Sequence, residues 1–291
     1  MLLYRGSDFR PEYKKIACLR STFTDAPILG LSATVTMAVV ADILTSLQLN
    51  RNDVTIKSYP PDRPNLYLEV VSSTEPVETA LEWLITGVVK DQQQYPKTVI
   101  FARTINCVSD IYTTLMYRLG NKAYCDATHD SSHRLISMFH AHISDPLQEY
   151  TLREFAKSDS VIRVLVCTIA FGMGIEIADI RRVVHWGPTS SMLAFWQEFG
   201  RAGRDGMPAI ATWYARGKAD ADKETFQKVR SKDFCVRKTI LDTFVLPETD
   251  YSSLQRMAHR QSCDAACTTC SCALCTCCSY CRQRCRCSSQ L

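Results

Sequence analysis

Two arginines near residue 200 have the spacing of a phosphate-binding pair. Arg201 and Arg204 stand three residues apart and are separated by the small residues Ala202 and Gly203. This spacing lets both guanidinium groups face one anion. The planar fork of arginine suits phosphate oxygens, and arginine recurrently stabilises the charge that develops on a transferring phosphoryl group. The alternative is that both are surface charges on a glycine-rich turn.

A second stretch, about thirty residues earlier, has the composition of an anion-binding loop. The apolar run 161–167 is followed by Thr168 and by two glycines, Gly172 and Gly174. A buried strand that opens into such a loop presents backbone N–H groups to a phosphate. We therefore expect both stretches to serve phosphate or nucleotide chemistry.

These stretches resemble known helicase motifs. The string Gln197-Glu198-Phe199-Gly200-Arg201-Ala202-Gly203-Arg204-Asp205-Gly206 resembles the sixth motif of superfamily-two helicases, and with Ala170-Phe171-Gly172-Met173-Gly174-Ile175 upstream it resembles the RecQ family of DNA helicases. The resemblance implies an ATP-dependent 3′-to-5′ DNA helicase. In it, Arg201 and Arg204 would stabilise the γ-phosphate, Gln197 would sense it, and the loop of Gly172 and Gly174 would link DNA contact to the nucleotide cleft.

Three further stretches bear on contact with DNA. Phe9, Arg10 and Tyr13 surround a proline and are able to stack on bases and touch phosphate; they resemble the aromatic-rich loop of RecQ helicases. Arg103 and Thr104 end an apolar run and resemble the fourth helicase motif, which approaches the DNA backbone. The resemblance also places Thr168 on the DNA strand. A helix cap is the alternative for Thr104.

The pattern around these residues alternates strands and helices. It predicts strands near 66–72, 98–101, 162–167, 183–186 and 209–214, and helices near 77–90, 105–119, 147–155 and 192–199. Apolar strands separated by helices indicate a parallel sheet that is covered on both faces. We therefore predict an α/β, RecA-like, three-layer fold with helices on both faces of a parallel sheet, plus a small helical, Cys-rich zinc subdomain.

The chain divides at a proline-rich string. Pro60, Pro61 and Pro64 cannot continue a helix or a central strand, so a stiff linker is expected there. The predicted domains are the end of a first RecA-like lobe (1–57), a second lobe (58–217), a zinc-binding subdomain (218–270) and a Cys-rich tail (271–291). In the first, Ser32-Ala33-Thr34 resembles the third helicase motif, and Thr34 or Thr36 would cap a helix from Met37 to Leu47. The tail has few apolar residues to bury, so we expect disorder without metal; a gene-model artefact is the alternative.

Ten of the fifteen cysteines fall within residues 263–291, which indicates metal binding rather than disulfides in an intracellular protein. Thiolates spaced by two to four residues suit tetrahedral zinc. With the resemblance to the RecQ zinc subdomain, Cys235, Cys263, Cys267 and Cys270 are the predicted Zn²⁺ ligands.

Three other sets of polar residues are interpreted as structural rather than functional. His129, Asp130 and His133 are interpreted as polar loop residues rather than a metal site. Asp179 and Arg182 are expected to form a structural ion pair. His185 ends an apolar strand and is interpreted as a core histidine.

The composition permits nucleic-acid binding without demanding it. The 291 residues carry 34 Lys and Arg against 30 Asp and Glu, a net charge of +4. There is no run of eighteen apolar residues and no signal-peptide pattern, so we expect no membrane association and an intracellular location, the nucleus in a eukaryote. The expected partners are single-stranded and forked DNA.

The sequence contains no Gly-x-x-x-x-Gly-Lys-Ser/Thr string and no Asp-Glu pair. Those are the ATP-phosphate cradle and the Mg²⁺-binding acids that a first helicase lobe supplies. We therefore expect this chain to be a C-terminal fragment that is inactive by itself, with ATP and Mg²⁺ held by a lobe outside it. Two alternatives stay open: a non-catalytic single-stranded nucleic-acid-binding remnant of a helicase, and a Cys-rich metal-binding protein.

Overall fold

A computed structural model describes residues 18, 22–23, 26–172, 176–187, 189–217, 221–231, 233–250 and 276–285. The chain divides into two compact units. The first comprises 1–62 and 238–261, and the second comprises 63–237 and 262–291. One division of the chain thus falls within the proline-rich string. The remaining domain boundaries given above stay predictions.

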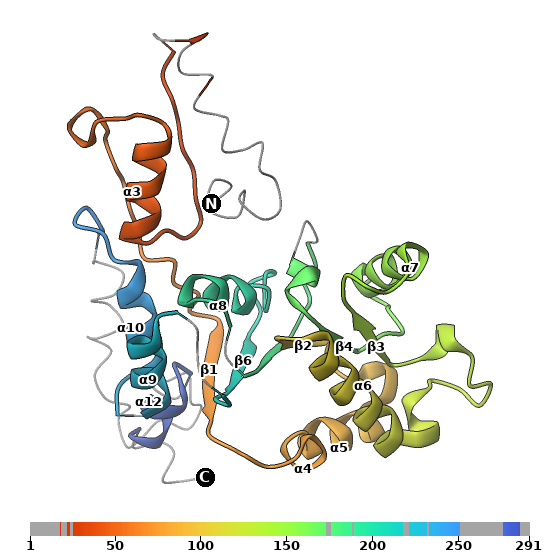
Figure 1. Cartoon of the computed structure of the whole chain (residues 1–291). Coiled ribbons are helices and arrows are strands. Elements are labelled where there is room, and N and C mark those ends of the chain that lie inside the picture. Colours follow the sequence, from red (N-terminus) through yellow and green to blue (C-terminus); the bar gives the residue numbers. More distant parts are fainter. Residues whose placement is uncertain are drawn as a thin grey trace. The chain divides into compact units, whose positions relative to one another are not determined.

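The second unit is built on one six-stranded sheet in which every pairing is parallel (Figure 1). Its order is β1-β6-β5-β2-β4-β3. The strands are β1 (Leu66–Val71), β2 (Thr98–Ala102), β3 (Ile136–Phe139), β4 (Val164–Cys167), β5 (Arg182–Trp186) and β6 (Ala209–Tyr214). β2 and β4 are buried along their whole length. This explains why their sequences are continuous apolar runs rather than alternating ones.

Helices cover both faces of this sheet, so the predicted RecA-like three-layer fold is confirmed. One face packs on α4 (Val77–Ala80), α5 (Glu82–Asp91) and α6 (Ile105–Leu119). Figure 1 shows α7 (Asp145–Ala156) and α8 (Met192–Phe199) on the other side. Short 3₁₀ turns lie between them: η3 (Gln92–Gln94), η4 (Gly120–Ala123), η5 (Ser131–His133) and η6 (Ile169–Gly172).

Hydroxyl side chains begin the helices that matter most for the site. The Thr104 side chain accepts a hydrogen bond from the amide of Cys107 at the start of α6, and Ser191 does the same for Ala194 at the start of α8. Such caps satisfy amides that lack an intrahelical partner. The cap expected as the alternative for Thr104 is therefore present.

The sequence prediction missed one strand and joined two helices. β3 was not predicted; it is a four-residue edge strand whose two middle residues are only half-buried, so its apolar signal is weak. The helix predicted at 77–90 is interrupted at Leu81, where φ is −104° and ψ is 16°. α7 begins at Asp145, two residues before its predicted start, with Pro146 in its first turn.

In the first unit, α3 (Met37–Ser46) is capped by Thr36, one of the two residues predicted for that role. The 3₁₀ turns η2 (Arg51–Asp53) and η7 (Asp242–Phe244) belong to the same unit. Arg51 forms an ion pair with Glu248, and the Thr249 hydroxyl donates to Ser58 Oγ at 3.0 Å. These contacts join the two segments of the unit across nearly two hundred residues of sequence.

Beyond β6 the chain forms α9 (Lys223–Ser231) and α10 (Val236–Leu241), and within the second unit it later forms α12 (Ser279–Gln283). The segment before α12 lies along the free edge of β1. The amide of Leu68 donates to Cys277 O at 3.2 Å, and Leu68 and Cys278 form a parallel bridge. The described part of the predicted disordered tail is thus a short helix joined to the sheet edge.

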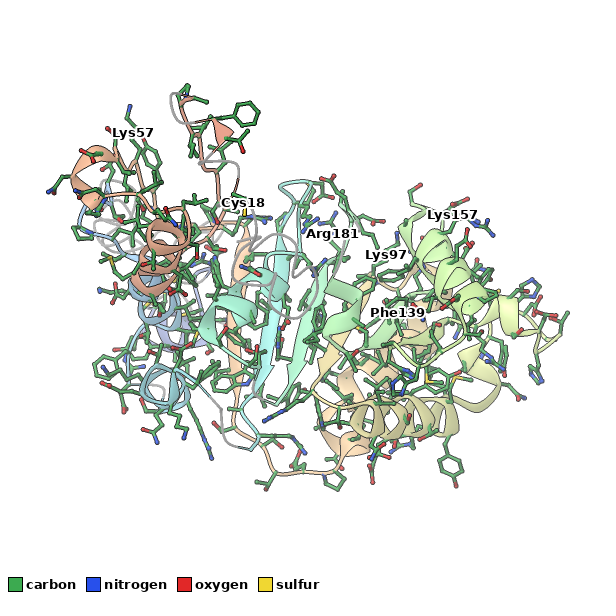
Figure 2. All side chains as sticks on the ribbon, turned by 45° about the horizontal axis from the view of Figure 1, so that its top comes forward. Cys18, Lys57, Lys97, Phe139, Lys157 and Arg181 are labelled. Carbon is green, nitrogen blue, oxygen red and sulfur yellow. The ribbon has the colours of Figure 1, made fainter. Side chains whose placement is uncertain are left out.

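Lys97 explains why the predicted Asp179–Arg182 ion pair is wrong. The Lys97 ammonium is almost fully buried; it donates to Asp179 Oδ1 at 2.9 Å and to the carbonyl of Lys157, a residue labelled with it in Figure 2. Arg182 instead lies over the ring of Trp83, with 4.2 Å from its guanidinium carbon to the ring centre. A buried cation without a partner is costly, so the carboxylate satisfies Lys97.

Among the described residues, no helix has both the length and the apolar composition needed to cross a bilayer.

Candidate phosphate and nucleic-acid site

The arginine pair lies on a turn that directly follows α8. Seven of the eight residues of this helix are buried, and Gln197 is the half-buried exception. Gly200 ends the helix, and residues 201–205 form turns. We call residues 200–207 the arginine loop. The C-terminal end of a helix carries a partial negative charge, which favours cations placed immediately after it.

Arg63 and Asn65, which the sequence analysis placed only in a linker, hold the arginine loop by hydrogen bonds to its carbonyl oxygens. The Arg63 guanidinium donates to the carbonyl oxygens of Gly200, Ala202 and Gly203 at 2.7–3.2 Å. The Asn65 amide donates to Gly203 and Met207. Burial, and then the neighbouring positive charge of Arg204, lowers the pKa of Arg63. The backbone of the arginine loop is therefore fixed by side chains that precede β1.

A second set of contacts fixes the opposite side of the loop. The amide of Gly203 donates to Ile180 O at 2.8 Å. Arg181 forms a two-pronged ion pair with Asp205, whose pKa this hydrogen bonding lowers. Such forked pairs fix orientation as well as charge. Asp205 is thus held by Arg181 at the edge of the loop.

Gly203 is required at the centre of the loop. Its φ is +57°, and a β-carbon there would lie 2.6 Å from both Asn65 Nδ2 and Met207 O. No other residue type fits without moving the backbone contacts just described.

Arg201 and Arg204 line one pocket, together with Phe171, Ile177 and Ile180. None of the described residues that line it carries a carboxylate. Arg201 is only 8% exposed and its guanidinium carbon lies 5.9 Å from the centre of the Phe171 ring, whereas Arg204 is exposed. Two cations beside an apolar wall suit an anionic group that is shielded from water, because low polarity strengthens the attraction. The lining does not suit Mg²⁺, which needs oxygen ligands.

Behind Arg201 lies a buried layer formed by His185, Glu198 and Cys167. His185 stacks on Phe101 and is 1% exposed, and burial lowers its pKa to about 3. Its Nε2 lies 3.4 Å from Glu198 Oε2. Burial, and then the charge of Glu198, raises the pKa of the Cys167 thiol well above its usual value. The interpretation of His185 as a core histidine is confirmed by its burial.

Three of the residues predicted to contact DNA, Arg103, Thr104 and Thr168, lie at a different end of the sheet. Arg103 and Thr104 follow β2 and Thr168 follows β4; the two strands are parallel neighbours, with Phe101 opposite Cys167. Arg103 and Thr104 are exposed, whereas Thr168 is buried and accepts from the amide of Ala170. These residues therefore meet at the carboxyl ends of the strands.

The arginine loop, by contrast, lies at the amino ends of β1, β5 and β6. It contacts Asn65, Ile180 and Arg181, which directly precede β1 and β5, and it leads into β6. In open parallel sheets, ligands usually bind at the carboxyl ends of the strands. The crossover 168–181 leaves the carboxyl end of β4 and reaches the amino end of β5, so it spans both sites. Gly172 ends η6 within this crossover.

Several predicted site residues lie outside the part of the chain that the structure describes: Phe9, Arg10, Tyr13, Gly174, Cys263, Cys267 and Cys270.

Cys235 lies in a group of four thiols whose other members differ from the predicted ones. The Sγ atoms of Cys235, Cys277, Cys278 and Cys281 all lie within 4.8 Å of one another. Cys235 Sγ is 3.8 Å from that of Cys277 and 4.0 Å from that of Cys278. Four thiolates at about 2.3 Å from a tetrahedral zinc ion would be about 3.8 Å apart. The group therefore fits Zn²⁺, and hydrogen bonds from the neighbouring thiols lower the pKa of Cys278.

Arg237 connects the thiol group with the support of the arginine loop. Its buried guanidinium donates to the carbonyl oxygens of Arg63 and Cys277 at 2.8 and 3.3 Å, and also to that of Leu66. Arg237 thus binds both Arg63, which holds the arginine loop, and Cys277 of the thiol group. In the sequence, only the position of Arg237 two residues after Cys235 points to this contact.

Comparison with known proteins gives consistent results. Residues 78–206 match the helicase conserved C-terminal domain family. The chain is 34% identical over 207 residues to "ATP-dependent helicase wrn-1" of Caenorhabditis elegans, covering 70% of this chain and 18% of that protein. It is 32% identical over 224 residues to "ATP-dependent DNA helicase RecQ" of Haemophilus influenzae, covering 77% and 32%. The chain therefore spans a third or less of the length of these relatives.

Among solved structures, the chain is similar to Saccharomyces cerevisiae Dbp5 bound to RNA and ADP BeF3, with 17% identity, a TM-score of 0.48, and coverage of 78% of this chain and 58% of that one. The helicase-domain match and the similarity to RecQ proteins over 70–77% of this chain support its assignment as a C-terminal region of a RecQ-family helicase.

Proposed function

We propose that this chain is the motor half of an ATP-dependent 3′-to-5′ DNA helicase that supplies arginines to ATP held by another lobe. The pocket lined by Arg201 and Arg204 is the observation that carries the proposal. Single-stranded and forked DNA are the proposed partners, duplex unwinding in recombination and repair the proposed task, and the nucleus the proposed location in a eukaryote.

In this mechanism, Arg201 and Arg204 have different tasks. Arg201 is buried against Phe171 and is fixed before the phosphate arrives, so little reorganisation is needed when charge develops on the transferring group. Arg204 is exposed, and its Nε lies 3.5 Å from Gly200 O, which leaves it able to turn toward a bound phosphate. Gln197, half-buried one turn before, would sense the same group.

DNA would be gripped at the opposite end of the sheet by Arg103, Thr104 and Thr168. The crossover 168–181 provides a direct covalent route between the two sites. Its first residue caps η6, and its last residues, Ile180 and Arg181, hold the arginine loop. A shift of Thr168 on DNA would therefore be transmitted to the loop that contacts phosphate. The four-thiol group would bind one structural Zn²⁺ and keep Arg237 against Arg63.

The ATPase role is tested in a polypeptide that joins this chain to a nucleotide-binding helicase lobe. Arg204→Ala should lower DNA-stimulated ATP turnover by at least about 100-fold, because arginines of this kind contribute factors of about 10³–10⁵. Arg204→Lys keeps the charge but not the fork and should recover only part of the rate. Arg118→Ala, a surface arginine paired with Glu82, is the control. Unchanged turnover in Arg204→Ala would refute the role.

The DNA contact is tested with this chain alone and fluorescent single-stranded DNA. Arg103→Ala should weaken binding and reduce the salt dependence of log K by about 0.7, the value for one phosphate contact. Arg118 lies in the last turn of α6, the helix that begins just after Arg103 and Thr104, so Arg118→Ala should leave both quantities unchanged. Equal effects of the two substitutions would contradict a DNA site at the carboxyl ends of the strands.

A further inference from the structure

A short two-stranded contact closes the loop between α6 and β3. Tyr124 and Arg134 form an antiparallel bridge, the amide of Cys125 donates to His133 O at 2.9 Å, and that of Leu135 donates to Ala123 O at 2.9 Å. Backbone hydrogen bonds therefore hold Cys125 and His133 opposite each other, independently of any contact between their side chains.

Side chains with metal-binding atoms gather at this closure. The ligand atoms of Cys125, Asp126 and His133 all lie within 4.8 Å of one another. Asp126 Oδ2 lies 2.7 Å from His133 Nδ1, and Asp126 Oδ1 accepts from the Thr128 hydroxyl at 2.7 Å. The Thr128 hydroxyl thus fixes one carboxylate oxygen and also lies 3.1 Å from His133 Nδ1, while the other carboxylate oxygen faces the imidazole. Cys125 and His133 are half-buried and Asp126 is exposed.

We propose that Cys125, Asp126 and His133 form a second zinc site, separate from the four-thiol group, with a fourth coordination position open to water. A thiolate, an imidazole and a carboxylate form a mixed set that zinc accepts, whereas Mg²⁺ and Ca²⁺ need oxygen ligands only. The geometry requires small movements, since tetrahedral zinc ligands of these types lie about 3.3–3.6 Å apart.

The charges balance at such a site. Zn²⁺ binding would release the Cys125 thiol proton to water, and the thiolate and the Asp126 carboxylate would together neutralise the ion. Because zinc binding releases a proton, it should weaken as pH falls.

Zinc content of the full chain tests the proposal. After equilibration with Zn²⁺ and removal of free metal, elemental analysis should find two zinc ions per wild-type chain. The double variant Cys125→Ser/His133→Gln should lose one of them, and Cys235→Ser should lose the other. Cys107→Ser and Asp130→Asn are matched controls, since Cys107 is half-buried like Cys125 and Asp130 makes a similar turn in the same loop, outside the ligand group. Both controls should keep two.

A second measurement separates ligation from loss of folding. In a Cys235→Ser/Cys278→Ser background, Co²⁺ should give a thiolate-to-cobalt charge-transfer band that disappears on adding Cys125→Ser. Circular dichroism in metal-free buffer should be the same with and without Cys125→Ser. The proposal is overturned if the background variant gives no such band, or if the zinc content of the Cys125→Ser/His133→Gln chain equals that of the wild type.

Discussion

At the residue scale, His185 makes the stability of the second unit depend on pH. Burial lowers its pKa to about 3 in the folded chain, against about 6.5 when unfolded. The unfolded state therefore binds the proton first, so stability present above about pH 6.5 is lost as pH falls toward 3. The loss approaches about 4 kcal/mol if Glu198 keeps its charge state.

We predict that His185→Phe, which keeps an aromatic ring against Phe101, reduces the slope of unfolding free energy against pH between 6.5 and 4 by up to about 1.4 kcal/mol per pH unit. Urea unfolding at several pH values measures this slope. A His185→Phe chain with the wild-type slope would mean that the ring is protonated in the folded state.

The residue scale also shows the limit of reading sequence alone. Arg201 and Arg204 can be identified from the sequence, because the two arginines stand three residues apart and a glycine lies between them. Arg63 cannot, because its three acceptors are carbonyl oxygens nearly 140 residues away, and a carbonyl acceptor leaves no mark on residue type. Its neighbours Pro61 and Pro64 indicate a linker. They predict the backbone conformation there, but not the hydrogen bonds of the Arg63 side chain.

At the scale of the element, the arginine loop depends on one backbone conformation. We predict that Gly203→Ala destabilises the chain by about 2–4 kcal/mol, because it combines a positive φ with close approaches to Asn65 and Met207. Gly206 also has a positive φ, +82°, but open space around it. Gly206→Ala should therefore cost only about 1 kcal/mol. Thermal or urea unfolding compares the two.

Equal losses for the two alanine variants would show that backbone strain alone, and not contact with Asn65 and Met207, demands glycine in the loop.

At this scale the sequence predicted most elements well, since buried parallel strands are continuous apolar runs. It missed β3 because an edge strand of four residues has too few buried positions to show a period. It also selected thiols by their mutual spacing, whereas the structure joins Cys235 to the pair Cys277 and Cys278.

At the scale of the whole second unit, the thiol group secures one edge of the sheet. We predict that Cys281→Ser raises hydrogen exchange of the Leu68 and Val70 amides by at least about 10-fold, because these amides donate to Cys277 O and Ser279 Oγ. Amides of β3, at the other edge, should exchange as in the wild type. Unchanged protection at Leu68 would show that α12 holds this edge without its thiols.

The bridge between Leu68 and Cys278 also bears on how the protein behaves in a crowded solution. β1 is an end strand, and uncovered end strands offer rows of backbone donors and acceptors to other chains. Here the segment that carries Cys277 and Ser279 occupies part of that row, because it accepts hydrogen bonds from the amides of Leu68 and Val70. If Zn²⁺ joins these thiols as proposed, loss of the ion or oxidation of the thiols would release this segment and leave the edge of β1 open to pairing with other chains.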